Sequence, residues 1–172
     1  MLGAETIVDR IAALNRSAAS QAIPVISTAD AHTEDDPEFR AWPPHCVSGT
    51  AGQHKPSATL LENRVTIPNT PGLPDLDGAQ QFVLEKQTFD CFTNVNLAAL
   101  LERLGAERYV VYGVVTEICV QFAAMGLLKT GARVELATDA VRSLSDANRE
   151  KVFADFIAAG GILTTSAEAM AC

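Results

Sequence analysis

Cys119 is the residue with the clearest potential for covalent chemistry. It lies in the segment GVVTEICV (113–120), where an apolar run turns at a glycine into a helical pattern. With Thr116 as the N-cap, Cys119 would be the third residue of that helix. Free amide groups and the positive end of the helix dipole would favour a thiolate there and bind the oxyanion formed when it attacks a carbonyl. The alternative is that Cys119 is a small apolar residue that packs a helix on a sheet.

Lys86 is a second residue that could take part in such chemistry. It ends the apolar run QFVLEK (81–86). A cation close to a thiol lowers the pKa of that thiol, and an ammonium group could also pass a proton. The alternative is a surface lysine whose alkyl chain lies along apolar side chains.

Asp30, His32 and His45 form a third group with potential chemistry. Residues two apart in an extended chain point the same way, so Asp30 and His32 could bind one ion that His45 completes from the following loop. Carboxylate and imidazole ligands suit Zn²⁺, Fe²⁺ or Mn²⁺ with positions open for water or a substrate atom. Glu38, in the same loop, is a weaker fourth candidate. The alternative is that both histidines are hydrogen-bonded loop residues.

Trp42 could contribute to a pocket for an aromatic substrate. It precedes Pro43, Pro44 and His45, and an indole held by two prolines makes a stiff, flat wall suited to ring stacking. An anchor for the loop in a minor core is equally compatible with the sequence. We expect His54 to lie on the surface, and Cys46 to be a packing residue and not a metal ligand.

Alternating helices and strands must position these residues. Strands that take turns with helices of 11–16 residues indicate βαβ units, and therefore a parallel sheet with helices on both faces. Ligands bind beyond the carboxyl ends of such strands, where Asp30, Lys86 and the segment after Gly113 fall. Residues 33–80, rich in Pro, Gly, Asn and Asp, are expected to form a packed functional loop. The expected helices are 5–18, 94–104, about 117–129 and 144–159, and the expected strands are 22–28, 81–86, 108–113, 132–138 and 161–164.

Length and composition exclude several classes of protein. A chain of 172 residues predicts a single domain, 1–172. The net charge is −8 and no window is rich in Lys or Arg, which argues against nucleic acid or an anionic membrane as a partner. No apolar segment is long enough to span a membrane or resembles a secretory signal, and the four cysteines do not form a disulfide pattern. We therefore expect a cytoplasmic protein. The absence of a glycine-rich phosphate loop after the first strand argues against a nucleotide-binding flavodoxin-like domain.

Three motifs resemble the isochorismatase-like cysteine hydrolases. The segment GVVTEICV resembles the nucleophile segment of that family, and FVLEKQTFDCF resembles its lysine segment. The string DAH, followed by WPPHCVSGTAG, resembles the metal-site and pocket region of the nicotinamidase branch. The motifs occur in the order found in the family, and the resemblance covers about residues 3–165.

The resemblance implies a fold and a set of reacting groups. The fold would be three-layer α/β/α with a mostly parallel sheet of about six strands, in an isochorismatase-like (Rossmann-like) topology, usually in a homo-oligomer. Cys119 would be the nucleophile and Lys86 the lysine of a catalytic triad. The amides of Val115 and Cys119 would form the oxyanion hole, and the peptide between Val114 and Val115 would be cis.

The resemblance also implies a metal and a pocket. Asp30, His32 and His45 would bind a divalent cation, with zinc favoured and iron or manganese as alternatives. In nicotinamidases that cation holds the pyridine nitrogen, and Trp42 would be the ring-stacking wall.

One element of the family is absent from this sequence. The family opens with a central strand that ends in the Asp of the triad, whereas GAETIVDRI matches the helix that comes next. We expect no residue to replace that Asp, because Asp30 is assigned to the metal and Asp139 to a later strand end. Neighbouring strands would then expose unpaired backbone groups, at about 1–3 kcal/mol each. We therefore expect either a longer native chain or a rearranged sheet without activity.

The function predicted from these residues is that of a metal-dependent amidohydrolase, most like nicotinamidase. It would convert nicotinamide and water to nicotinate and ammonia through a thioester on Cys119. Another hydrolase of the same family, acting on a different small amide or ureido acid, is the first alternative. A non-catalytic binding protein on the same fold is the second, favoured by the absent Asp.

Overall fold

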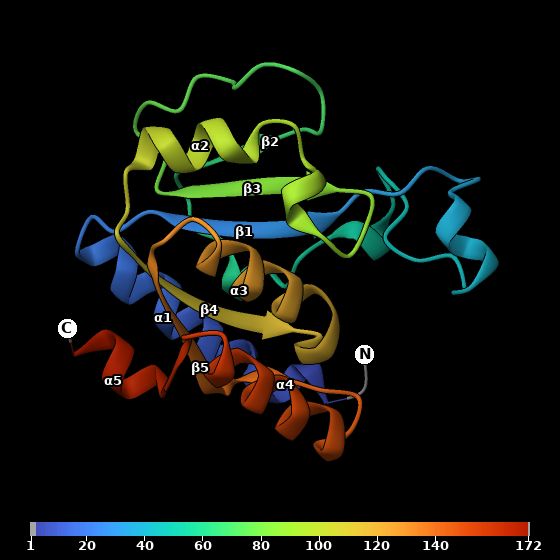
Figure 1. Ribbon diagram of the computed structural model, residues 1–172. Helices are drawn as coiled ribbons and strands as arrows, with labels where there is room; N and C mark the ends of the chain where they lie inside the picture. The colour runs from blue at the N-terminus through green and yellow to red at the C-terminus, as the bar shows by residue number, and fades with distance from the viewer. Residues whose placement is uncertain (1–2, 172) are drawn as a thin grey trace.

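The computed structural model describes residues 3–171 and has a three-layer α/β architecture with parallel strands (Figure 1). One sheet has the order β1-β3-β2 and the other has the order β4-β5-β6. All neighbouring strands are parallel, as the alternation of helices and strands predicts. The strands are β1 (Val25–Asp30), β2 (Arg64–Ile67), β3 (Gln81–Lys86), β4 (Arg108–Val114), β5 (Arg133–Arg142) and β6 (Ile162–Thr164).

Helices pack on the sheets through three apolar clusters. In the first cluster, Leu100 of the helix 97–104 packs with Leu84 of β3, and both side chains are fully buried. Leu136 and Phe156 centre a second cluster between the second sheet and two further helices. Leu14 meets the opposite face of β5 in a third. The α-helices are α1 (Val8–Ser20), α2 (Leu97–Leu104), α3 (Gln121–Leu128), α4 (Asp146–Ala158) and α5 (Ser166–Met170), and none of them is long and apolar enough to cross a bilayer.

Within residues 3–171 the strands divide into two parallel sets between β1 and β4. In the described part of the chain, no strand pairs with the edge of β1 opposite β3 or with the edge of β4 opposite β5. The family resemblance predicts unpaired edges where its central strand has no counterpart, and the interruption agrees with that expectation.

Most predicted elements are confirmed, with shifted ends. Strand β3 has the predicted bounds, and Gly105 ends α2 in a left-handed conformation with φ +58°. The long loop 33–80 contains the unpredicted strand β2 and the short helical turns η2 (Pro37–Arg40), η3 (Ala51–Gln53) and η4 (Ser57–Thr59). The short helix α5 was also missed. These elements are three to five residues long, which is too short for a periodic pattern.

Candidate active site

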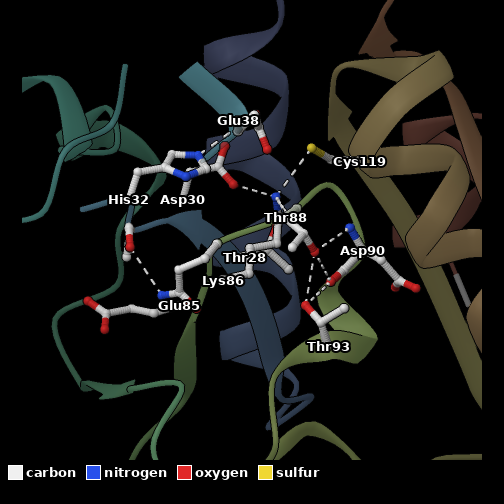
Figure 2. Close-up of polar contacts among 12 residues, drawn as sticks. Thr28, Asp30, His32, Glu38, Glu85, Lys86, Thr88, Asp90, Thr93 and Cys119 are labelled. Carbon is white, nitrogen blue, oxygen red and sulfur yellow. Dashed lines mark hydrogen bonds and ion pairs between the residues drawn. The ribbon is translucent and has the colours of Figure 1, made fainter. Parts of the chain in front are cut away.

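Asp30 and Lys86 lie side by side because their strands end in register. Asp30 ends β1 and is the direct neighbour of Lys86 at the end of β3. The side chain of Lys86 is only 2% exposed, so its ammonium group needs partners. It forms an ion pair with Asp30 Oδ1 and donates hydrogen bonds to the Thr88 carbonyl at 2.8 Å and to Cys119 Sγ at 3.4 Å (Figure 2). A cysteine, a lysine and a carboxylate therefore meet at the carboxyl edge of the strands.

Burial and the neighbouring charges of opposite sign shift the pKa values of Lys86 and Cys119 in opposite directions. Burial lowers the pKa of Lys86, but Cys119 and Asp30 raise it more, so that the net pKa is above the ordinary value. Burial raises the pKa of Cys119, whereas the Lys86 charge and hydrogen bonds from Lys86 and the Val115 backbone lower it only in part. The net rise differs from the lowered thiol pKa that we expected from a helix terminus and a lysine, because those arguments left out desolvation.

The turn that carries Cys119 differs from the predicted helix start. Residues Thr116–Val120 form a single π-helical turn, η6, in which Ile118 has the non-helical angles φ −123° and ψ −106°. The regular helix α3 begins only at Gln121, so Cys119 is not the third residue of an α-helix. Thr116 is not the N-cap, and its buried hydroxyl has no hydrogen-bond partner among the described residues. The peptide between Val114 and Val115 is cis, as the resemblance implies.

Glu117 ties the turn that carries Cys119 to the first turn of α4 and the loop before it. Its carboxylate accepts hydrogen bonds from Ser143 Oγ at 2.6 Å, the Leu144 amide at 2.9 Å and Asn148 Nδ2 at 3.1 Å. The sequence analysis missed this role. The three donors lie 26–31 residues further along the chain, so no local pattern connects them to Glu117.

The predicted metal residues come together in the structure. Asp30, His32 and His45 each offer a ligand atom, and these atoms lie within 4.8 Å of one another. His32 is 1% exposed, and its Nδ1 is 3.0 Å from Asp36 Oδ2. Since a carboxylate oxygen only accepts, Nδ1 is the donor in this contact, which in a neutral imidazole leaves the lone pair on Nε2. That Nε2 atom is buried without a hydrogen-bond partner in the described part of the chain, as a free metal ligand would be.

His45 and Glu38 complete the surroundings of this cluster. His45 Nδ1 is 2.9 Å from the Pro43 carbonyl, which again leaves Nε2 available as a ligand. Glu38 Oε1 lies 3.6 Å from His45 Nε2 and 3.9 Å from His32 Nε2, so the predicted fourth candidate faces both imidazoles. Figure 2 shows Glu38 beside His32. The donor set of imidazoles and carboxylates fits a divalent transition metal. Asp36, which orients His32, was missed in the sequence.

Two aromatic rings lie close to each other in the loops around the site. Trp42 is 42% exposed, and its ring meets the Phe89 ring edge-on at a centroid distance of 6.4 Å. The sequence analysis singled out Trp42 but missed Phe89. His54 is exposed, as predicted, and Cys46 does not belong to the metal cluster.

Lys55 is a further cation that the sequence analysis missed. Its Nζ donates a hydrogen bond of 2.8 Å to the carbonyl of Thr28, in β1. Burial lowers the pKa of Lys55, and the negative charge of Asp30 opposes that shift. A second ammonium group therefore lies close to the end of β1.

A parallel α/β fold that gathers a cysteine, a lysine and a carboxylate at its strand ends defines a class of proteins equipped for nucleophilic chemistry. A family model described as the isochorismatase domain matches residues 2–168, and the chain belongs to the isochorismatase family. The family resemblance found in the motifs is thereby confirmed.

Named relatives and solved structures agree with this assignment. Streptothricin hydrolase of Streptomyces noursei is 39% identical over 80 residues, which cover 44% of this chain and 29% of that protein. The chain spans between 29% and 63% of the length of the curated relatives considered. The pyrazinamidase/nicotinamidase of Streptococcus mutans superposes with a TM-score of 0.79 at 24% identity, covering 95% of this chain and 87% of that one. The pyrazinamidase of Pyrococcus horikoshii, solved in complex with zinc, gives 0.77 at 24% identity, covering 94% and 86%.

Proposed function

We propose that this chain is a cysteine-dependent amidohydrolase whose substrate is nicotinamide. The observation that carries the proposal is the contact of one buried ammonium group, on Lys86, with both Cys119 Sγ and Asp30. Burying an ammonium group is costly unless it is paired, and the partners of Lys86 include a thiol and a carboxylate. Here the charge lies between a nucleophile and a carboxylate, which is an arrangement suited to acyl transfer.

The reaction follows from these groups. Cys119 attacks the carboxamide carbon as a thiolate paired with the Lys86 ammonium, and the amides of Val115 and Cys119 stabilise the oxyanion. As the carbon–nitrogen bond breaks, Lys86 gives a proton to the leaving nitrogen, and ammonia departs. Neutral Lys86 then takes a proton from the water that attacks the thioester. Cys119 leaves as a thiolate, the acid is released, and the ion pair is restored.

A divalent cation would be held by Asp30, His32 and His45. When bound, it would supply an open coordination position that can hold a ring nitrogen of the substrate. Trp42 and Phe89 offer aromatic surface for the substrate ring at the same end of the fold. The pyrazinamidase solved with zinc supports both the aromatic amide and the metal.

A second candidate function is hydrolysis of another small amide. The relative with 39% identity is named a streptothricin hydrolase, so the family includes proteins named for other substrates. Ammonia release from nicotinamide, pyrazinamide, benzamide and a ureido acid separates the two. Nicotinamide and pyrazinamide should be hydrolysed well and benzamide poorly, since benzamide has no ring nitrogen for the cation.

Replacement of the nucleophile tests the proposal directly. Cys119→Ala should abolish ammonia release from nicotinamide while the circular dichroism spectrum stays unchanged. Cys91→Ala is the matched control, because Cys91 is a buried core thiol with no part in the mechanism. Turnover that survives in the Cys119 variant would refute the proposed nucleophile.

A further inference from the structure

Asp30 belongs to two groups at once. One of its oxygens, Oδ1, forms the ion pair with Lys86, and its carboxylate also lies within 4.8 Å of the ligand atoms of His32 and His45. Its side chain is 26% exposed, so it is accessible to an ion from solution. Figure 2 shows the carboxylate of Asp30 between the imidazole of His32 and the ammonium group of Lys86.

Among residues 3–171, Asp30 is the carboxylate that contacts Lys86. The hydrogen-bond and ion-pair partners of Lys86 in the described part of the chain are Asp30, the Thr88 carbonyl and Cys119. The sequence analysis expected no residue to replace the Asp of the family triad, but the structure puts Asp30 in contact with the lysine. The lysine that contacts the nucleophile is therefore held by the same residue that would bind the cation.

We propose that Asp30 is a shared carboxylate, which positions Lys86 beside Cys119 and ligates the divalent cation. A carboxylate has two oxygens with about four lone-pair directions, so it can serve both partners. Asp30 acts on the nucleophile only through Lys86, which makes it a positioning residue. The inference rests on the proposed function for its purpose, but its geometry and its tests are independent of the substrate.

Because Lys86 and the cation would share the carboxylate of Asp30, the presence of one should weaken the binding of the other. The ammonium group of Lys86 neutralises part of the charge of Asp30 and repels a cation bound to the other oxygen. Removing that ammonium group should therefore tighten metal binding. If Lys86 only supported the shape of the site, removing it would loosen metal binding or leave it unchanged. The sign of the change separates the two roles.

Zinc affinity measures this coupling. In Lys86→Met, which removes the charge but keeps an unbranched side chain only one atom shorter, the zinc dissociation constant measured by competition with a chromophoric chelator should fall about tenfold, a typical coupling between two sites. Lys55→Met is the comparison variant, because its ammonium group bonds to the Thr28 carbonyl and interacts with Asp30 through charge alone, without a hydrogen bond. We expect a clearly smaller change there. Unchanged or weaker zinc binding in Lys86→Met, or no zinc binding by the parent protein, would overturn the proposal.

A second experiment tests the positioning role without metal. With EDTA present, p-nitrophenyl acetate should acylate Cys119, and the burst of p-nitrophenol should be absent in Cys119→Ala. Asp77→Asn is the matched control and should keep the rate of the burst, because Asp77 is an exposed carboxylate that pairs with Arg103 and has no contact with Lys86. Asp30→Asn should lose at least about tenfold in that rate. Equal rates in the Asp77 and Asp30 variants would show that Asp30 is a metal ligand only. Since nicotinamide is absent from both experiments, a failure here is distinct from a failure of the proposed substrate.

Discussion

A substitution at Gly126, in α3, would test how packing between the two sheets holds Lys86 and Cys119 together. A Cβ atom at this position would lie 2.2 Å from Cε2 and 2.5 Å from Cδ2 of Phe92. Phe92 belongs to the turn η5 (Cys91–Thr93) that follows β3, whereas α3 continues from the turn that carries Cys119. The contact between Phe92 and Gly126 thus joins the Lys86 side of the site to the Cys119 side.

Gly126→Ala should force these two sides apart. Carbon atoms pack best at about 3.5–4.0 Å, so the ring or the helix must move by about 1 Å. Overpacking of this kind costs about 1–3 kcal/mol of the free energy of unfolding. A misplacement of about 1 Å can reduce the rate of a positioned reaction about 100-fold. The contact of 3.4 Å between Lys86 Nζ and Cys119 Sγ is the one that the movement would lengthen.

Two measurements separate the loss of stability from the loss of position. Urea denaturation gives the free energy of unfolding, and ammonia release from nicotinamide gives the turnover rate. Gly161→Ala is the matched control, because its Cβ atom would lie 2.3 Å from the Phe156 ring of α4, in the cluster of the second sheet and not between the Lys86 side and the Cys119 side of the site. It should lose comparable stability but keep its turnover. The double variant Gly126→Ala with Phe92→Leu should recover activity. Equal turnover in the two alanine variants would refute the reasoning.

Three further predictions concern other contacts. Glu117→Ala removes three hydrogen bonds to a carboxylate. We expect the free energy of unfolding, measured by urea denaturation, to fall by about 2–4 kcal/mol and the turnover rate to fall as well. An unchanged turnover rate would count against a role of Glu117 in holding the turn that carries Cys119. Hydrogen bonds from Arg108 hold the pKa of Glu135 below its ordinary value, so its contribution to stability should be present above about pH 4.3 and be lost as the pH falls through the lower folded value. The stability difference between the parent protein and Glu135→Gln should therefore shrink in acid, and a constant difference would contradict this. His45→Ala should lose the roughly one equivalent of transition metal per chain that we expect by elemental analysis; unaffected metal content would exclude His45 as a ligand.

The parts of the fold that could be predicted are those with a strong periodic pattern. Strand β3 could be predicted to its bounds because it is mostly buried and is followed by a polar segment. Strand β2 could not, because only four residues of extended chain lie within a Pro- and Gly-rich segment. The start of α3 was misplaced because Ile118 leaves helical geometry, and nothing in the residue types around it signals that departure.

The site could be predicted as far as residue type and strand position allow. Lys86 and Asp30 end predicted strands, and the motif around Cys119 follows a third, so their meeting follows from the parallel topology. Asp36 and Phe89 could not be predicted, since their roles depend on loops whose path has no periodicity. Asp30 and Lys86 are paired in the register of β1 and β3. The sequence analysis did not predict their contact, because it assigned Asp30 to the metal alone.

The division of the strands into two sheets determines what holds Cys119 beside Lys86. Asp30 and Lys86 belong to the sheet β1-β3-β2, whereas Cys119 follows β4 of the other sheet. In the described part of the chain, no ladder of backbone hydrogen bonds connects these two sheets, so the contact between Lys86 and Cys119 depends on side-chain packing. Packing contacts such as that of Phe92 on Gly126 are less directional than a strand ladder. The geometry of the site should therefore be more sensitive to substitutions at the contact between Phe92 and Gly126 than to substitutions in the strands at positions other than Asp30 and Lys86.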